Sequence, residues 1–281
     1  MIQRSLIFAA TTQFGIDIRT SPCGEGGAGL ISMGVMKASP DLPSDDRPPP
    51  PLQDIDAWVF DLDNTLYPAS SNLFPQIDVR MRRFIAEALH LSLDDAYVLQ
   101  KRYYHQYGTT LRGLMLTHDI EPDDFLSYVH DIDYSILPPA PMLDQALGRL
   151  PGRKLIFTNG SERHAQNVLA RLGLTRHFDA VFDIRAAGYI PKPDAESYAI
   201  MIERHGLDPH RTAMFEDIAR NLLPAAIAGM TTIWVREDGH SHWGGDETAD
   251  LSHVHHVTGD LAGWLDAVVD ARRAALPAAL P

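Results

Sequence analysis

The sequence predicts an α/β fold built on a Rossmann-like parallel sheet, with a helical cap domain inserted after the first strand. Two observations support this prediction. Short apolar runs of strand length alternate with helical patterns through most of the chain, which is typical of a parallel sheet covered on both faces. One long segment after the first run, residues 67–140, instead has apolar residues at helical spacing and no run of strand type.

The first 51 residues differ in composition from the rest of the chain. Four glycines lie between residues 24 and 29, and residues 48–51 are all proline, with no apolar period in the segment. Such a composition buries no core, so we interpret residues 1–51 as a disordered leader. The apolar stretch 5–10 is too short for a secretory signal, and Met33 and Met36 offer later start sites.

Five apolar runs predict the strands of the core, which we assign to residues 52–66 and 141–281. These runs are residues 57–60, 154–157, 180–182, 212–215 and 231–235. Helices are expected between and after them, at 161–172 with Ser161 as the capping residue, at 218–228 and at 261–269. Ligands of such sheets bind beyond the carboxyl ends of the strands, so polar residues at those ends are candidates for a site.

Helices are expected throughout the inserted cap, residues 67–140. An apolar stripe from Ile77 to Leu89 predicts the first helix, Ser92 is suited to cap the second, and Pro122 to begin a third. Tyr103 and Tyr107 lie on one face of the second helix. They either contact a substrate or form the buried stripe of that helix, and the sequence leaves both interpretations open.

The charge and cysteine content exclude several classes of function. The chain has 37 acidic and 24 basic residues, a formal net charge of -13, which disfavours binding to a nucleic acid polymer or an anionic membrane. No apolar run reaches the roughly 18 residues of a membrane span. The single cysteine, Cys23, excludes an internal disulfide and fits a reducing compartment, so we expect a cytoplasmic protein. A phosphate site here would need local positive charge from a metal, a lysine and backbone amides.

Polar residues follow the strand-like runs at several places and together suggest one site. They are Asp61, Asp63, Thr158, Asn159, Lys192, Glu216 and Asp217. Two carboxylates spaced by one residue at a strand end would be costly to bury without a metal. Taken singly, each motif has a plainer interpretation, such as a loop cap for Asp61 and Asp63, or a solvated turn for Lys192 between two prolines. Their order along the chain favours a common site.

These motifs resemble those of the haloacid dehalogenase superfamily over about residues 54–260. The matching segments are 61–65, 158–160, Lys192 and 216–217. The resemblance implies that Asp61 attacks phosphorus to form an aspartyl-phosphate, and that Asp63 protonates the leaving oxygen and then deprotonates the attacking water. It also implies Mg²⁺ held by the Asp61 carboxylate, the Asp63 backbone carbonyl and Asp217, with Glu216 acting through a bound water.

The same resemblance assigns the phosphate-binding groups. Phosphoryl transfer is catalysed mainly by positioning and by neutralisation of charge. Lys192 supplies one positive charge beside Mg²⁺. The Thr158 hydroxyl, the Asn159 backbone N–H and the start of the following helix are expected to donate hydrogen bonds to phosphate oxygens.

The presence of an acid at position 63 limits which reactions of the superfamily fit this chain. A dehalogenase needs neither this acid nor the metal, and transport ATPases carry threonine at this position. Sugar phosphomutases share the acid, so a mutase stays a competing interpretation. A non-catalytic scaffold that binds phosphorylated metabolites is also open, although such a chain is expected to lose one of the key residues, and none is lost here.

A second resemblance, to the pyrimidine 5′-nucleotidase branch, rests mostly on cap residues. It is carried by segments 61–68, 72–75, 103–108 and 111–114. It implies a pyrimidine nucleoside 5′-monophosphate as substrate, with tyrosines near Arg112 that stack on the base. Phosphoglycolate or another small phosphorylated metabolite is the alternative substrate.

Overall fold

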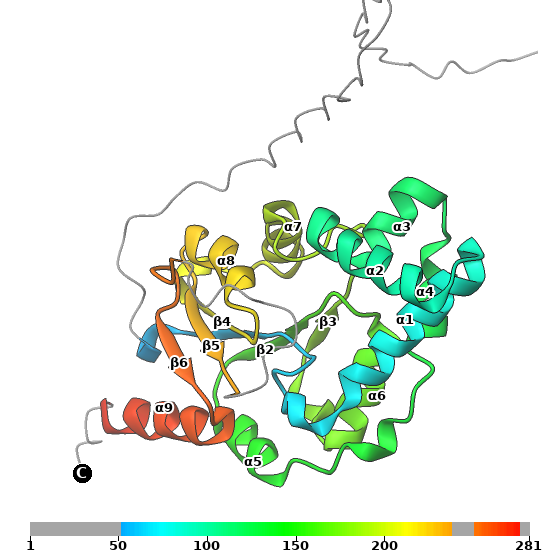
Figure 1. Ribbon diagram of the computed structural model, residues 1–281. Coiled ribbons are helices and arrows are strands. Elements are labelled where there is room, and N and C mark those ends of the chain that lie inside the picture. Colours follow the sequence, from blue (N-terminus) through cyan, green and yellow to red (C-terminus); the bar gives the residue numbers. More distant parts are fainter. Residues whose placement is uncertain (1–51, 238–249, 276–281) are drawn as a thin grey trace, which may run out of the picture. The chain divides into compact units, whose positions relative to one another are not determined.

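A six-stranded, all-parallel sheet forms the centre of the core in the computed structural model, which describes residues 52–237 and 250–275 (Figure 1). The strand order is β3-β2-β1-β4-β5-β6. The strands are β1 (Ala57–Phe60), β2 (Arg153–Phe157), β3 (Ala180–Phe182), β4 (Thr212–Glu216), β5 (Thr231–Val235) and β6 (His256–Thr258). The predicted α/β fold with a parallel sheet and a helical insertion is confirmed, and β6 adds a short edge strand to the five predicted runs.

The helices fall into a core set and an inserted set. The core helices are α5 (Pro141–Arg149), α6 (Glu162–Leu172), α7 (Ala195–His205), α8 (Leu223–Ile227) and α9 (Leu261–Ala275). The inserted helices, between β1 and α5, are α1 (Leu73–Leu89), α2 (Leu93–Tyr107), α3 (Thr110–His118) and α4 (Pro122–Val129). Short 3-10 turns lie at η1 (Leu52–Asp54), η2 (Ala69–Ser71), η3 (Tyr134–Ile136), η4 (Thr175–His177), η5 (Pro209–Arg211) and η6 (Ala219–Leu222).

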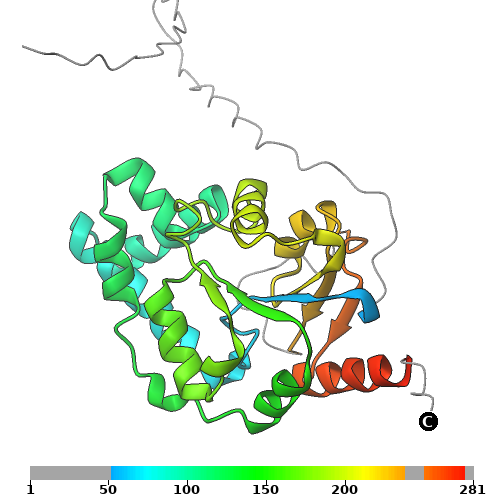
Figure 2. The ribbon, with the colours of Figure 1, turned by 180° about the vertical axis from the view of Figure 1, so that it is seen from behind.

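Side chains of β1 alternate between the two faces of the sheet, as the geometry of a strand requires. Trp58 and Phe60 pack with α5, α6 and α9 on one face. Ala57 and Val59 pack with α7 and the η6–α8 segment on the other. Both faces are therefore covered by helices, which Figures 1 and 2 show from opposite sides.

Local signals placed most helix ends correctly. The Ser92 hydroxyl caps α2 by accepting a hydrogen bond from the Asp95 N–H (3.1 Å), and Pro122 lies in the first turn of α4. The helix expected over 218–228 is instead split into η6 and α8. Pro224 has no N–H to continue a helix from the preceding turn, so the α-helix begins at Leu223.

The inserted helices have a core of their own, which settles the role of two tyrosines. Tyr103 is 5% exposed and belongs to this cluster, and the Tyr107 ring lies 5.6 Å from it. Tyr103 is therefore part of the buried stripe of α2, and the half-buried Tyr107 packs against it. The two ends of the insertion do not belong to this cluster. Tyr67 and Leu137 pack instead in the main hydrophobic core, with β1 and the helices α5, α6 and α9.

No helix in the described part of the chain has both the length and the apolar character needed to cross a bilayer.

Candidate active site

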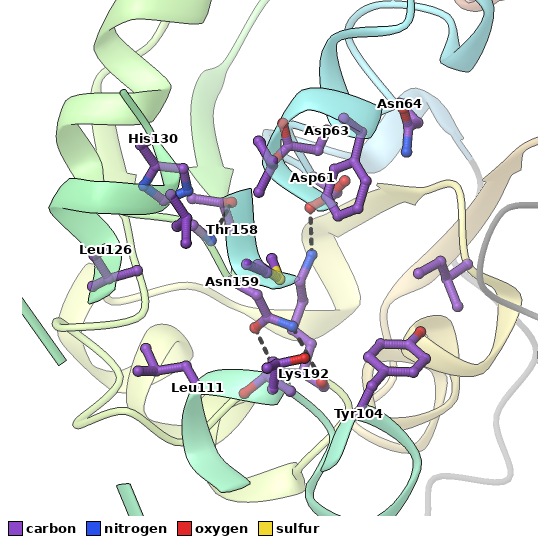
Figure 3. Close-up of a pocket in the computed structure, with 18 of the residues that line it drawn as sticks. Asp61, Asp63, Asn64, Tyr104, Leu111, Leu126, His130, Thr158, Asn159 and Lys192 are labelled. Carbon is purple, nitrogen blue, oxygen red and sulfur yellow. Dashed lines mark hydrogen bonds and ion pairs between the residues drawn. The ribbon is translucent and has the colours of Figure 1, made fainter. Parts of the chain in front are cut away.

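The carboxyl ends of β1, β2 and β4 lie side by side and bring the predicted residues together. The register pairs Phe60 with Ile156 on one side and with Phe215 on the other. The residues that follow these strands therefore meet at one edge of the sheet (Figure 3). All seven candidates line the same cavity of about 140 Å³: Asp61, Asp63, Thr158, Asn159, Lys192, Glu216 and Asp217. A cavity needs only roughly 10–15 Å³ to hold one water, so a small organic group can enter this one.

Lys192 joins two of the carboxylates. Its Nζ lies 2.6 Å from Asp61 Oδ1 and 2.6 Å from Glu216 Oε2, and its side chain is 2% exposed. Burial alone would lower the pKa of Lys192, but the charges of Asp61 and Glu216 raise it above its ordinary value. Lys192 is therefore a buried cation of the site, and its interpretation as a solvated turn residue is wrong.

Asn159 fixes the backbone that carries this lysine. The Asn159 side chain accepts a hydrogen bond from the Lys192 N–H (2.8 Å) and donates one to the Lys192 carbonyl (3.3 Å). Because its side chain is engaged in this way, the backbone N–H of Asn159 is the group that can donate to a ligand. The Thr158 hydroxyl accepts from the Gly160 N–H (2.9 Å), and its own hydrogen can be donated to a ligand.

Three acids form a cluster that fits a divalent metal. Carboxylate oxygens of Asp61, Glu216 and Asp217 lie within 4.8 Å of one another. Burial and the charge of Glu216 raise the pKa of Asp61 to about 7 and raise the pKa of Asp217 well above its usual range. The cluster thus has more negative charge than Lys192 offsets. Hard oxygen ligands at this spacing suit Mg²⁺, which would supply the missing positive charge.

Glu216 has both carboxylate oxygens engaged by the protein. Oε2 receives Lys192, and Oε1 accepts hydrogen bonds from the Asn221 side chain (3.1 Å) and the Ile218 N–H (3.3 Å). These contacts favour a metal bound through water at this residue, as the sequence resemblance implies.

The Asp63 carboxylate has partners of its own, apart from the acidic cluster. Its Oδ1 accepts hydrogen bonds from His164 Nε2 (2.7 Å) and from the Tyr67 hydroxyl. Burial alone would raise the pKa of Asp63, but the charge and hydrogen bond of His164, together with the Tyr67 hydrogen bond and the charge of His130, lower it below its ordinary value. Sequence reasoning missed both partners. The one available signal for His164 was its place in the first turn of a helix that follows a site strand.

The side of the cavity formed by the inserted helices is mainly apolar. It is lined by Phe74, Ile77, Met81, Leu111, Phe125, Leu126 and Val129. Tyr104 also lines the cavity. Its hydroxyl accepts a hydrogen bond from Arg220, and its ring centroid lies 4.8 Å from the Arg220 guanidinium. Arg112 pairs with Asp194 (3.3 Å), so this arginine is engaged by the core.

Comparisons with known proteins agree with this geometry. A family described as haloacid dehalogenase-like hydrolase matches residues 55–229, more than half of the chain. The chain is 30% identical over 204 residues to phosphate metabolism protein 8 of Saccharomyces cerevisiae, which covers 65% of this chain and 63% of that protein. It is 35% identical over 117 residues to (S)-2-haloacid dehalogenase of Xanthobacter autotrophicus, 40% of this chain and 45% of that one.

A phosphatase is also among the relatives. Phosphoglycolate phosphatase of Mesorhizobium japonicum is 26% identical over 223 residues, which cover 73% of this chain and 93% of that protein. The chain thus spans less than two thirds of the first two relatives and nearly all of this third one. These relatives do not indicate the pyrimidine 5′-nucleotidase branch. The family match spans the strands and the motif residues that build the cavity, and the chain belongs to the haloacid dehalogenase-like hydrolases.

Proposed function

We propose that the protein is a Mg²⁺-dependent phosphatase of a small phosphorylated metabolite, and that Asp61 is its nucleophile. The observation that carries this proposal is Asp63. Its carboxylate lines the cavity two residues after Asp61, yet lies outside the acidic cluster that suits the metal. A phosphatase needs such a separate acid and base, whereas displacement of a halide by a carboxylate does not.

The reaction would proceed in two steps. In the complex that reacts, Asp63 carries a proton, although the pKa of its carboxyl is lowered in the protein without substrate. An Asp61 oxygen forms a bond to phosphorus as the bond to the leaving oxygen breaks, and Asp63 gives its proton to the leaving oxygen. Water then attacks the aspartyl-phosphate, Asp63 takes a proton from the water, and the bond between phosphorus and Asp61 breaks. Lys192 and the Thr158 hydroxyl hold phosphate oxygens throughout.

The residues of the acidic cluster would hold the metal. Asp61, the Asp63 backbone carbonyl and Asp217 are the proposed ligands, with Glu216 acting through water. When bound, Mg²⁺ supplies charge neutralisation at the phosphate oxygens.

For the substrate we propose a pyrimidine nucleoside 5′-monophosphate. The apolar wall and the Tyr104 ring favour a leaving group with a flat apolar face over a hexose or the charged glycolate. Stacking of a base on an aromatic ring contributes about 1–3 kcal/mol, or roughly one or two powers of ten in kcat/KM. The choice of a pyrimidine over a purine rests on the sequence resemblance alone.

Phosphate release from a panel of phosphomonoesters tests these proposals together. We expect activity with Mg²⁺ that is lost in excess chelator and restored by Mg²⁺, and a higher kcat/KM for UMP and CMP than for AMP, GMP, phosphoglycolate or hexose phosphates. Equal or higher kcat/KM for AMP or GMP would contradict the choice of a pyrimidine. Equal or higher kcat/KM for phosphoglycolate or a hexose phosphate would contradict the nucleotide assignment, and the phosphatase proposal would stand in both cases. Isomerisation of a hexose phosphate would instead identify a mutase. Full activity in chelator would contradict the metal-dependent mechanism.

A further inference from the structure

We propose that His164 is a positioning residue that holds the Asp63 carboxylate in place for proton transfer, an inference that rests on the proposed phosphatase function. His164 lies in the first turn of α6 and is fully buried. Its Nε2 donates to Asp63 Oδ1 over 2.7 Å. Asp63 lies 101 residues earlier in the chain, so the contact depends on the fold.

The orientation of the His164 ring is fixed at both nitrogens. Its Nδ1 lies 3.0 Å from the Tyr134 hydroxyl oxygen, and the same hydroxyl lies 2.9 Å from the His130 carbonyl oxygen. Rotation of the ring would therefore break two hydrogen bonds at once. A buried histidine with only a structural role has no need to direct one nitrogen at the acid of the site.

A second histidine fixes the plane of the ring. The His130 ring stacks on His164, with centroids 4.4 Å apart and planes 11° from parallel. His130 Nδ1 lies 2.9 Å from the hydroxyl of Ser161, the residue that caps α6. The stack thus ties the end of α4 to the start of α6, where His164 contacts Asp63.

Both hydrogen bonds to Asp63 end at the same carboxylate oxygen, so the two oxygens of this carboxylate have different roles. Tyr67 and His164 meet at Oδ1. Oδ2 is then the oxygen that exchanges a proton with the leaving group and with water. General acid–base catalysis depends on such placement, and a carboxylate that is free to rotate would lose part of it.

The test compares two variants of His164 on two substrates. In His164→Gln the side-chain amide can still donate from about the position of Nε2, whereas in His164→Asn it is too short to do so. The substrates are the alkyl phosphate of the panel with the highest kcat/KM, whose leaving oxygen needs a proton, and 2,4-dinitrophenyl phosphate, whose leaving oxygen does not.

We expect His164→Asn to lower kcat/KM for the alkyl phosphate by about 100-fold, the lower end of what general acid–base catalysis contributes, and by less than about tenfold for the dinitrophenyl ester. His164→Gln should recover much of the loss. KM should change little, because Lys192 and Thr158 are untouched. Tyr67→Phe, which removes the other bond to Oδ1 with little change in volume, should shift the ratio of the two substrates in the same direction.

His177→Asn is the matched control. His177 Nε2 contacts Asp144 Oδ1 at the same 2.7 Å, and its side chain is 9% exposed, but it does not line the cavity. This variant should leave the ratio of the two substrates unchanged. An equal loss on both substrates in His164→Asn and Tyr67→Phe would overturn the positioning role alone. A wild-type protein that releases phosphate from neither ester would overturn the proposed function as well.

Discussion

Asp61 is buried beside two other acids, and Lys192 is the cation that reaches it directly. Replacing Asp61 by asparagine keeps the shape of the side chain but removes both the proposed nucleophile and a proposed metal ligand. We expect Asp61→Asn to lower kcat by several powers of ten, each about 1.4 kcal/mol of barrier, with an unchanged circular dichroism spectrum. Retention of even a tenth of the wild-type rate would exclude the covalent mechanism.

The raised pKa values of Asp61 and Asp217 predict how stability depends on pH. The pKa of Asp61 is about 7 in the folded protein, against 3.8 for an ordinary aspartate, and the pKa of Asp217 is raised in the same direction. Between these pH values the folded state holds more protons than the unfolded state, so the contribution of the cluster to stability falls as pH rises. Burial lowers the pKa of His130 to about 3, which contributes in the opposite sense over part of this range.

Comparing the Tm of wild type with the Tm of Asp217→Asn separates the contribution of Asp217 from that of His130. In chelator, we expect the variant to gain thermal stability relative to wild type as pH rises from about 4 to about 7, by a few degrees, since about 1 kcal/mol shifts Tm by roughly 2–4 °C at this size. Mg²⁺ should raise the Tm of wild type at about pH 7.5 and that of the variant much less. A fall in the Tm of the variant relative to that of wild type as pH rises would contradict the assigned pKa directions.

Helix packing in the cap gives a prediction at the level of elements. Gly113 in α3 faces α2 so closely that an added Cβ would lie 2.4 Å from Tyr103 Cγ. Glycine to alanine usually stabilises a helix by up to about 1 kcal/mol, but overpacking of a core costs typically about 1–3 kcal/mol. We expect Gly113→Ala to be destabilising in urea denaturation.

Gly148→Ala in α5 supplies the comparison, because the nearest atom to its added Cβ is His177 Cε1 at 3.4 Å. This variant should be neutral or stabilised. If both variants changed stability by the same amount and sign, the close approach of α2 and α3 would be wrong.

Elements whose signals are local were predictable, and contacts across the chain were not. The strand 57–60, the Ser92 cap and the Pro122 start each depend on a few neighbouring residues. α3 was missed because its nine residues include a glycine and lie directly after α2. His164 was missed for another reason: its partner is 101 residues away, and a single histidine on a helix has no periodic or motif signal.

The candidate site residues were predictable from the order of helices and strands, because most of their motifs directly follow strands. A parallel sheet places such residues at one edge, whatever the loops between them do. The apolar wall was not predictable, since which face of each inserted helix meets the cavity depends on how α1, α3 and α4 pack together. That is why the sequence could not separate Tyr104, which lines the cavity, from its neighbour Tyr103, which does not.

At the scale of the whole chain, the composition of residues 1–51 predicts that they add little stability. A chain beginning at Leu52 should keep its Tm and turnover, because it retains η1, where Arg272 Nη1 donates to the carbonyls of Leu52 (3.0 Å) and Ile55 (2.7 Å). A chain beginning at Asp56 loses both acceptors and should be less stable. A fall in Tm of more than about 8 °C for the first deletion, on the order of 2–4 kcal/mol, would show that the removed segment packs.

The insertion between β1 and α5 also bears on how this protein could diversify. The proposed nucleophile, Asp61, and the proposed phosphate-binding residues all lie outside the inserted residues 67–140. The inserted helices can therefore change the wall that lines the cavity without altering the proposed attacking group. The same segment, however, carries Tyr67, His130 and Tyr134, which surround the Asp63–His164 contact. A cap transplanted from a relative would therefore exchange the surface that selects the substrate and the support of the proton donor together, and the two traits would be inherited as one unit.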